Sequence, residues 1–308
     1  MKVVKKILKI LCIIIISIVS LLIINDVRIM LSYKINNYEE VLNIYGYKDY
    51  YVPQSITYSK KYNVILETAY NSKHKVSKLY VIDYDSGKLL KELKLIKPDN
   101  TENTKHVGGI TTNDELVWIT SDYEIEEYIL EDIINTSNDY IKSIKLDKLY
   151  NRGDYCVYKD NLLLIGDFYL YPIYKVPNNN PLLLAYNLSN EIDYKYPAFA
   201  VSMPKMVQGL AINDNHEYIV TQSYTYLVNS KMRKYKLVDK DETININNRE
   251  IKYYKFNDSS LVSKKTLPPM AEGLFYKDSY LYILFESNSK KYSLAFPKIN
   301  KLIKVYAN

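Results

Sequence analysis

The sequence is poor in the residues that build disulfide frameworks and zinc sites. It has two cysteines among 308 residues, and Cys12 lies in an apolar N-terminal run, where it could not pair with Cys156 in a folded domain. No disulfide framework is therefore available, and the fold must depend on its core. The three histidines, His74, His106 and His216, lack the spacing of metal ligands, which argues against a zinc site built from histidine and cysteine.

Common catalytic motifs are also missing. The chain contains no Gly-x-Ser-x-Gly elbow, no P-loop and no His-Glu-x-x-His sequence, so no catalytic residue can be assigned from a motif. The net charge of +6 arises from 41 Lys and Arg against 35 Asp and Glu, and the two signs are interspersed. This mildly basic surface is not a nucleic-acid footprint, and we expect no nucleic-acid partner.

Tyrosine, by contrast, is abundant, with 34 residues against a single tryptophan. Two explanations stay open for this excess. The codon bias of an AT-rich genome, combined with β-propensity, would produce it. An aromatic surface suited to sugars or wall polymers would produce it as well.

The N-terminus predicts attachment to a membrane. Four lysines within the first nine residues precede an apolar run from Ile10 to Ile24, and a helix from Ile7 is just long enough to span a bilayer. No small-residue cleavage site follows Ile24, so we expect an uncleaved signal anchor, with secretion after cleavage as the alternative. The positive-inside rule predicts a single-pass protein of the cell membrane whose C-terminal domain lies outside. The expected segments are a cytoplasmic basic tail (1–6), a transmembrane signal anchor (7–24), a juxtamembrane stalk (25–44) and an extracytoplasmic domain (45–308).

The expected domain is built from internal repeats. Each repeat has a short polar or Gly-containing strand start, a β-prone run, a polar turn and a second β-prone run, and the best-preserved copy spans Pro268–Ser287. The number of residues from the start of one copy to the start of the next is typical of an all-β propeller with about four strands in each blade. We expect five blades, with six as the alternative if Tyr45-Gly46-Tyr47 supplies an edge strand that closes the ring. The polar, Asn-rich stretch 230–249 predicts an exposed loop. The five copies begin at residues 54, 108, 154, 208 and 272.

Superposing the copies brings polar residues to equivalent places. One set stands at the start of the inner strand and another at the end of its antiparallel partner, so both sets are expected at one mouth of the central channel. His106, two residues before the second strand start, would add an imidazole to that rim. The candidate ligand-binding residues are Gln54, Glu67, His106, Asp154, Asp167, Gln208, Gln222, Glu272 and Glu286.

Two interpretations of this carboxylate-rich mouth stay open. Oxygen ligands from several directions suit Ca²⁺ or the ammonium or guanidinium group of a ligand, and we name Asp167, Glu272 and Glu286 as candidates for metal ligands. Propellers also use such rings to join adjacent blades through hydrogen bonds to backbone groups. No cofactor is required by the sequence, and Ca²⁺ is the one that the carboxylates would accept.

The chain resembles a family of secreted or membrane-anchored bacterial β-propeller proteins of unassigned activity. The segments that carry this resemblance are Lys105–Ile110, Lys205–Leu210 and Pro268–Ser287. The Gln-Gly-Leu and Glu-Gly-Leu strand starts are more remotely similar to those of five-bladed glutaminyl cyclotransferases, although Leu274 stands where that family favours Trp. The resemblance implies a propeller fold, and it does not imply a particular activity.

Two functions are therefore expected as alternatives. The first is a membrane-anchored binding module whose channel mouth takes a cell-wall polymer, a small cationic ligand or a protein partner. The second is an extracytoplasmic enzyme, a glutaminyl cyclotransferase-like or lactonase-like hydrolase or lyase. It would use Glu272 or Glu286 as general acid or base, with or without a Ca²⁺ ion. We favour the binding module because no catalytic triad is supported by spacing.

Overall fold

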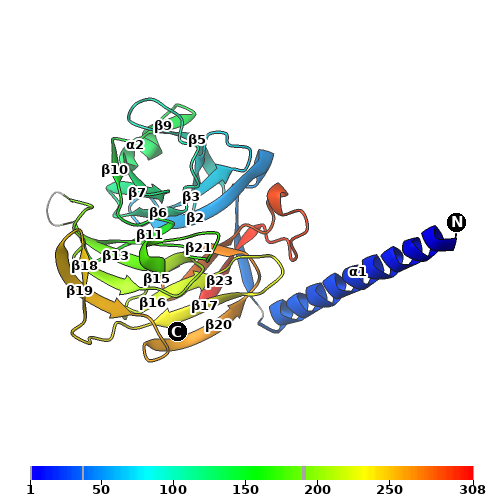
Figure 1. Ribbon diagram of the computed structural model, residues 1–308. Coiled ribbons are helices and arrows are strands. Elements are labelled where there is room, and N and C mark those ends of the chain that lie inside the picture. The colour runs from blue at the N-terminus through cyan, green and yellow to red at the C-terminus, as the bar shows by residue number, and fades with distance from the viewer. Residues whose placement is uncertain (1, 37, 189–191, 308) are drawn as a thin grey trace.

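Short β-prone runs separated by tight turns form five mainly antiparallel sheets around a central axis, and a long helix projects from this ring (Figure 1). The structure is a computed structural model that describes residues 2–36, 38–188 and 192–307. The prediction of an all-β propeller with five blades is confirmed. Residues 45–47 form no strand, so they do not supply a sixth blade.

In each blade the innermost strand turns back into its partner through a short hairpin. In the third and fifth blades both central residues of that turn have positive φ, 49° and 64° at Asp160 and Asn161, and 50° and 68° at Asp278 and Ser279. Positive φ at both positions defines the turn whose twist suits two-residue hairpins. We call the end of the propeller with these turns the hairpin end, and the opposite end, where the inner strands begin, the loop end.

The first two blades follow one another along the chain and are joined by an exchanged strand. A segment of the second blade returns to pair in parallel with the outermost strand of the first. The first blade contains β2 (Tyr51–Ser59), β3 (Val64–Asn71), β4 (Lys78–Asp83), β5 (Leu89–Ile96) and the added β9 (Tyr140–Lys142). The second contains β6 (Gly109–Thr112), β7 (Leu116–Ser121), β8 (Glu124–Ile129) and β10 (Lys145–Lys148), with the short helix α2 (Leu130–Asn135) after β8.

The third and fourth blades exchange material in the same way. Residues 230–249, expected as a loop, instead contribute strands to both blades, so that expectation is wrong. The third blade contains β11 (Tyr155–Lys159), β12 (Leu162–Gly166), β13 (Leu182–Asn187), β14 (Phe199–Ser202), β19 (Arg249–Lys255) and β18 (Thr243–Ile246). The fourth contains β15 (Val207–Ile212), β16 (Tyr218–Gln222), β17 (Ser230–Tyr235) and β20 (Leu261–Leu267).

The fifth blade closes the ring with a strand from the other end of the chain. Its three C-terminal strands pair in sequence, and β1 is then added at the outer edge, with Glu39 opposite Lys304. The segment expected as a stalk therefore includes a propeller strand, and the propeller begins before Tyr45. The strands of the fifth blade are β21 (Ala271–Lys277), β22 (Tyr280–Phe285), β23 (Lys301–Tyr306) and β1 (Glu39–Asn43).

The N-terminal helix α1 (Lys2–Asn36) contains a stretch, Val3–Ser32, that is long and apolar enough to cross a membrane. The most apolar part of this stretch is not buried by the propeller. The helix continues without interruption beyond residue 24, and Ile29 is completely buried. An N-terminal apolar helix of this kind is consistent with a signal anchor or with a signal peptide.

Five apolar clusters fill the spaces between neighbouring blades. The single tryptophan, Trp118, is buried between the second and third blades. Because side chains alternate between the two faces of a strand, each blade contributes to the cluster on either side. The propeller therefore has five inter-blade cores, and removing one blade would expose two of them.

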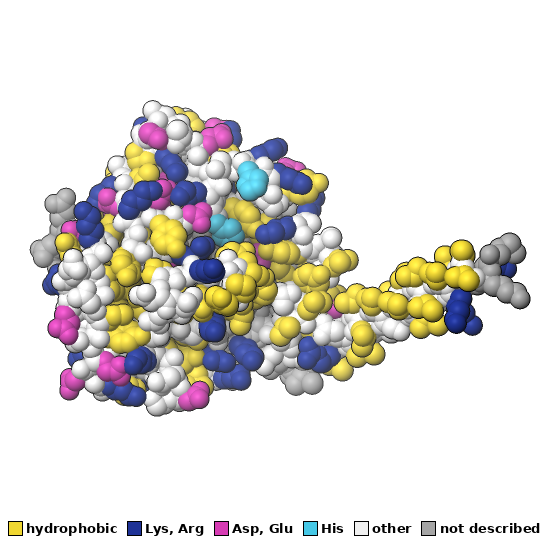
Figure 2. All heavy atoms as spheres, in the orientation of Figure 1, with side chains coloured by type: hydrophobic (Ala, Val, Ile, Leu, Met, Phe, Trp, Pro, Cys, Tyr) yellow, Lys and Arg dark blue, Asp and Glu magenta, His cyan; other side chains and the backbone are white. Residues whose placement is uncertain are grey.

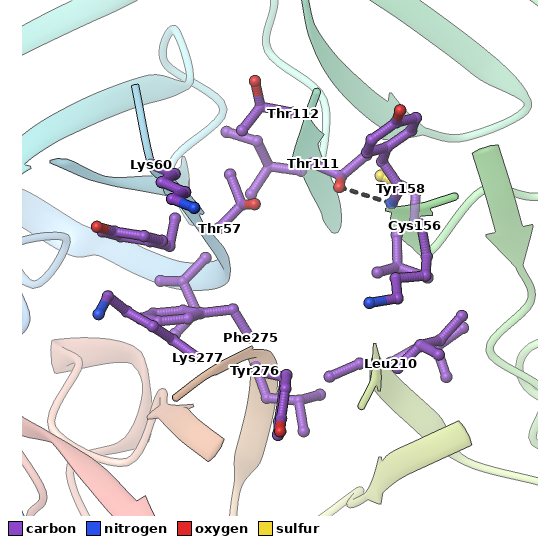
Figure 3. Close-up of a pocket in the computed structure, with 18 of the residues that line it drawn as sticks. Thr57, Lys60, Thr111, Thr112, Cys156, Tyr158, Leu210, Phe275, Tyr276 and Lys277 are labelled. Carbon is purple, nitrogen blue, oxygen red and sulfur yellow. Dashed lines mark hydrogen bonds between the residues drawn. The ribbon is translucent and has the colours of Figure 1, made fainter. Parts of the chain in front are cut away.

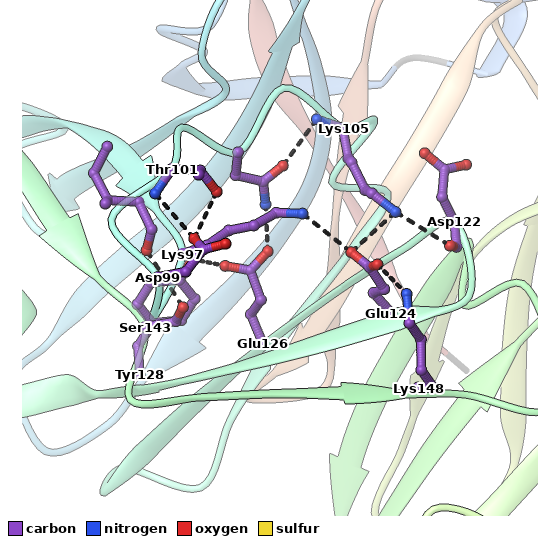
Figure 4. Close-up of polar contacts among 12 residues, drawn as sticks. Lys97, Asp99, Thr101, Lys105, Asp122, Glu124, Glu126, Tyr128, Ser143 and Lys148 are labelled. Carbon is purple, nitrogen blue, oxygen red and sulfur yellow. Dashed lines mark hydrogen bonds and ion pairs between the residues drawn. The ribbon is translucent and has the colours of Figure 1, made fainter.

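A polar cluster fixes the connection between the first two blades (Figure 4). The Glu124 carboxylate on β8 forms ion pairs with Lys97 at 3.2 Å, with Lys105 at 2.9 Å and with Lys148. Burial opposes ionisation of Glu124, but the three lysines outweigh it and lower the pKa of this carboxyl to about 2. The cluster holds the connection that carries His106 against the second blade.

Candidate functional site

Three of the expected strand starts occupy equivalent places in the structure. The inner strands of the first, fourth and fifth blades each contain an irregularity in register, at Gln54, at Gln208 and at Glu272-Gly273. A bulge re-aims a side chain that would otherwise alternate with its neighbours. The repeated strand starts in the sequence therefore correspond to a recurring bulge near the axis at the loop end.

The second set of expected equivalences needs correction. Gln222 lies opposite Val207 at the end of its strand, as expected. Glu67, however, lies opposite Ile56 inside the hairpin, two residues from the strand position equivalent to Gln222. Glu286 lies one residue beyond Phe285, which pairs with Ala271. Local sequence similarity could not reveal these shifts, because register depends on the pairing of two strands.

Glu67 has a structural role at the point where the ring closes. Its buried carboxylate accepts hydrogen bonds from the backbone N–H groups of Tyr45, at 3.1 Å, and Gly46, at 2.6 Å. Burial raises the pKa of Glu67 to about 7, against the lowering effect of these two donors. Glu67 therefore holds the segment between β1 and β2 through backbone hydrogen bonds.

Asp154 and Asp167 serve the third blade in the same manner. Asp154 pairs with Arg152 at 3.0 Å and accepts from the N–H of Phe168 at 2.8 Å. Asp167 accepts from the backbone N–H groups of Arg152, at 2.6 Å, and Leu182, at 3.2 Å. Burial, and the charge of Asp154, raise the pKa of Asp167 to about 7. These contacts favour the interpretation that the polar ring braces the blades.

Glu272 and Glu286 form a different arrangement, a buried pair of carboxyl groups. The side chains are hydrogen-bonded to one another, and the two residues are only 3% and 6% exposed. Gln54 Nε2 donates to Glu286 at 3.3 Å. Burial and the neighbouring charge of Glu286 raise the pKa of Glu272 well above its usual range, and burial raises the pKa of Glu286 to about 7 despite nearby Lys291. The pair therefore retains a proton near neutral pH.

Aromatic and cationic groups cover this pair. Lys291, in the 3₁₀ helix η3 (Lys290–Tyr292), donates to the Tyr70 hydroxyl at 2.6 Å, and the His106 ring stacks on Tyr70 with centroids 4.2 Å apart. Desolvation of the imidazole by the surrounding loops and the charge of Lys291 lower the pKa of His106. His106 is nevertheless exposed, so water screens part of this effect. His106 thus lies at the rim, as expected.

The remaining candidates do not converge on the carboxyl pair. Gln222 donates to the carbonyl oxygen of Lys205 at 2.7 Å, and Gln208 is half-buried in its bulge. Asp167 is bound to backbone groups of its own blade. In the described part of the chain, no three His, Cys, Asp or Glu side chains are grouped as metal ligands would be.

The open cavity lies at the other end of the axis, where the sequence offered no candidate (Figure 3). It has a volume of about 430 Å³. All five inner strands contribute to its wall, and the turns of the first, fourth and fifth blades add Lys60, Asp214 and Asp278-Ser279. The strand residues in the wall are 56–58, 110–112, 156–159, 210–212 and 274–277. Figure 3 shows Thr57, Thr111, Tyr158 and Tyr276 around the central space. The cavity is therefore a feature of the complete ring.

Glycines explain why the inner strands approach most closely at the loop end. A Cβ atom on Gly273 would lie 2.6 Å from Ser55 Cα, and one on Gly209 would lie 2.8 Å from the carbonyl oxygen of Glu272. The hydroxyl of Thr221 donates to that same oxygen at 2.7 Å. The Gly-Leu signature of the repeat therefore allows neighbouring inner strands to touch, and the space along the axis lies toward the hairpins.

The rim of the cavity combines tyrosines with lysines and aspartates. Lys159 is 3.7 Å from Asp214, whose other oxygen accepts from the Tyr276 hydroxyl at 2.9 Å. Lys277 pairs with Asp278 and lies over the Tyr58 ring, 5.1 Å from its centroid. Among the residues that the structure describes, no carboxylate lies within 4.0 Å of the Lys60 ammonium group.

A signal for this cavity was present in the sequence. Tyr158-Lys159-Asp160 matches Tyr276-Lys277-Asp278, and both stand at the first turn of a repeat. Such matches identify the repeat. They also place a tyrosine, a lysine and an aspartate at the hairpin end of two blades. Trp118 stacks on Tyr158 with centroids 6.1 Å apart, which links the only tryptophan to the cavity wall.

The comparisons with known proteins agree with the fold. No protein-family model matches the chain, and no curated protein matches it. Among solved structures, the glutaminyl cyclase of Myxococcus xanthus has 7% identity and a TM-score of 0.50, with 87% of this chain and 94% of that chain covered. The PQQ-bound aldose sugar dehydrogenase of Streptomyces coelicolor has 10% identity and a TM-score of 0.48, with 87% and 96% covered. At 7% identity, the likeness to the glutaminyl cyclase concerns the fold alone, and it does not assign an activity to this chain.

Proposed function

We propose that this protein is a membrane-anchored, outward-facing binding module that holds its ligand in the cavity at the hairpin end. One observation carries the proposal: all five inner strands end around a single space of about 430 Å³. This volume is within the range of small-molecule sites, and a site formed by every blade is available only in the folded ring. The carboxylates that suggested a cationic ligand are buried or bound to backbone groups at the other end.

The wall of the cavity suits a hydroxyl-rich ligand that also carries negative charge. Tyr58, Tyr158 and Tyr276 offer ring faces and hydroxyl groups, which suit sugars and polyols. The threonine hydroxyls of the inner strands can exchange hydrogen bonds with such a ligand. Lys60, which lacks a nearby carboxylate among the described residues, supplies a charge for a phosphate or carboxylate group. We therefore propose an anionic cell-wall polymer as the ligand class.

Titration of the full-length protein in detergent tests this proposal. The probe is poly(glycerol phosphate), and the readout is the fluorescence of Trp118, which stacks on the cavity residue Tyr158. We expect saturable binding that weakens about fivefold in Lys60→Gln, since a partly exposed charge pair contributes about 1 kcal/mol. Lys88→Gln, which removes another exposed lysine from an outer turn of the same blade, should leave binding unchanged. Equal binding by all three proteins, or no binding, would contradict the assigned cavity.

The Glu272–Glu286 pair supports a second candidate, an enzyme that uses a carboxylic acid at neutral pH. Cyclisation of an N-terminal glutamine forms a bond from the α-amino nitrogen to the side-chain carbonyl carbon and releases ammonia. A carboxyl pair that holds one proton could move a proton from the amine to the leaving group. Because Glu272 and Glu286 are nearly buried, Tyr70 and Lys291 would have to move to admit a substrate. The fold likeness to a glutaminyl cyclase makes this reaction the one to assay.

Ammonia release from a glutamine-initiated peptide tests this second candidate. Activity in the full-length protein that is lost in Glu286→Gln and kept in Lys60→Gln would favour the enzyme. Activity that is absent, or equal in wild type and Glu286→Gln, would leave the binding module as the proposal.

A further inference from the structure

The position of the membrane on α1 follows from its charges. No charged residue lies between Lys9 and Asp26. At about 1.5 Å per residue this stretch is roughly 24 Å long, and a snorkelling Lys9 extends it toward the hydrocarbon thickness of about 30 Å. If α1 spans the membrane, as its composition indicates, the outer edge of the hydrocarbon lies close to Asn25.

A propeller loop touches α1 on the membrane side of that edge. Asn25 Nδ2 donates to the carbonyl oxygen of Leu227 at 3.1 Å. Leu227 also lines a small hollow with Ile18, Leu21 and Leu22. These helix residues lie about 4 to 10 Å beyond Asn25 toward the membrane interior. The loop 223–229, which connects β16 to β17, therefore reaches the level of the lipid.

The helix is docked on the propeller, so this contact sets the orientation of the propeller relative to α1. Ile29, one turn from Asn25 on the same face, is completely buried, and the Tyr38 hydroxyl donates to the carbonyl oxygen of Thr266. Glu39 pairs with Lys304 toward the hairpin end of β23, whereas Leu227 lies at the loop end. From β1 back to Asn25 the chain thus runs along the blades toward the loop end, and α1 then leaves the propeller there (Figure 1).

The loops at the loop end expose large apolar side chains. They belong to the connections that follow β12, β16 and β22, and Figure 2 shows hydrophobic side chains among Lys and Arg on the part of the propeller next to α1. Apolar side chains that gather on one face mark an interaction surface. The exposed residues are Tyr171 (61%), Ile173 (62%), Tyr174 (40%), Tyr224 (46%), Leu227 (39%), Val228 (55%) and Leu294 (73%).

Exposed lysines lie over tyrosine rings at this end. Lys175 lies over the exposed Tyr171 ring, 5.8 Å from its centroid. Lys205 and Lys291 lie over the buried rings of Tyr169 and Tyr70, at 5.4 and 5.2 Å. Tyrosine together with lysine is the composition of a membrane–water interface, where the ring sits among headgroups and the ammonium group meets lipid phosphate. The surface is therefore matched in charge to anionic lipid.

We propose that the loop end of the propeller rests on the outer leaflet of an anionic membrane, with Leu227 and Val228 inserted beside α1. Loops 167–181, 223–229 and 286–300 form the contact. The carboxyl pair then faces the lipid, and the open cavity at the hairpin end faces away from it. The residues expected as a stalk do not hold the domain off the membrane. This inference rests on α1 spanning the membrane and is independent of what the cavity binds.

Spin labels on two valines of the fourth blade test the proposal. Val228 is at the loop end and Val238 follows β17 at the hairpin end, and both are exposed, so Val228→Cys and Val238→Cys should leave the core intact. The full-length chain would carry Cys12→Ser, and Cys156 is buried. The proteins are reconstituted in nanodiscs that contain phosphatidylglycerol. Folding of each is checked by Trp118 fluorescence.

We expect a nitroxide at 228 to collide more often with dissolved oxygen than with a water-soluble nickel chelate, because oxygen concentrates in lipid. A nitroxide at 238 should show the reverse. Chelate accessibility at 228 equal to that at 238 would overturn the proposal, since the loop end would then be in water. The proposal would also be overturned if intact mass showed that the membrane-extracted protein lacks residues 1–24.

Discussion

The buried Glu272–Glu286 pair makes a specific prediction about stability and pH. The pKa of Glu286 is raised from 4.5 to about 7 in the folded protein, mainly because its carboxyl group is buried. A folded-state pKa above the unfolded value means that the contribution to stability is fully present below pH 4.5. It is lost as the pH rises through 7, since only the unfolded chain ionises freely in that window. A shift of this size corresponds to about 3 kcal/mol, at 1.36 kcal/mol for each pH unit.

Glu286→Gln removes this titration while keeping a side chain of the same shape that can donate to Glu272. We expect the variant and the wild type to differ little in slope below pH 4.5. As the pH rises from 4.5 to 8, the free energy of unfolding of the variant should increase relative to that of the wild type by about 3 kcal/mol. Urea titrations of the full-length protein in detergent, followed by Trp118 fluorescence at a series of pH values, measure this difference.

A matched control is available at the opposite end of the same hairpin. Asp278 is an exposed carboxylate in the β21–β22 turn, so Asp278→Asn should give a stability curve nearly parallel to that of wild type. If the curves of wild type and Glu286→Gln were also parallel from pH 4.5 to 8, Glu286 would be ionised normally in the folded state. The description of a proton-sharing pair would then be incorrect.

Three other perturbations test the fold that positions the sites. Gly273→Ala should destabilise the propeller by about 1 to 3 kcal/mol in urea, because the new Cβ would lie 2.6 Å from Ser55 Cα on the next blade. Unchanged stability would mean that the inner strands are not in contact. Glu124→Gln should cost about 1 to 2 kcal/mol at pH 7 by leaving three lysines without their shared carboxylate. Since the pKa of Glu124 is lowered to about 2, this difference should disappear as the pH falls from 4.5 to 2, and an acid titration that shows a constant difference would be inconsistent with ion pairing. Tyr47→Phe removes a hydroxyl that donates to the carbonyl oxygens of Phe285, at 2.6 Å, and Ile299, at 2.8 Å, and should lower the free energy of unfolding by about 1 to 2 kcal/mol. A thermal melt identical to that of wild type would show that the segment between β1 and β2 does not secure the closure.

The sequence repeats predicted part of the candidate site. Superposing the copies placed Gln54, Gln208 and Glu272 in equivalent positions, and the structure has a bulge at each. The same superposition misplaced Glu67 by two residues, because the β2–β3 hairpin continues beyond it to Asn71. Sequence similarity between copies therefore located the inner strand starts, whereas the pairing of each hairpin decided where the second strand's residues lie.

The sequence by itself determined the local elements of this protein. Apolar alternation and turn residues specify the five hairpins, and the uninterrupted apolar run specifies a helix, because both patterns depend on residues that are close in the chain. The tertiary structure decided what depends on distant residues. Glu39–Asn43 closes the ring only because it meets β23 more than 250 residues later. Which end of the axis is open depends on glycine contacts between neighbouring blades, and the placement of the lipid-facing loops depends on how α1 docks. These relations arise between elements, so no single segment encodes them.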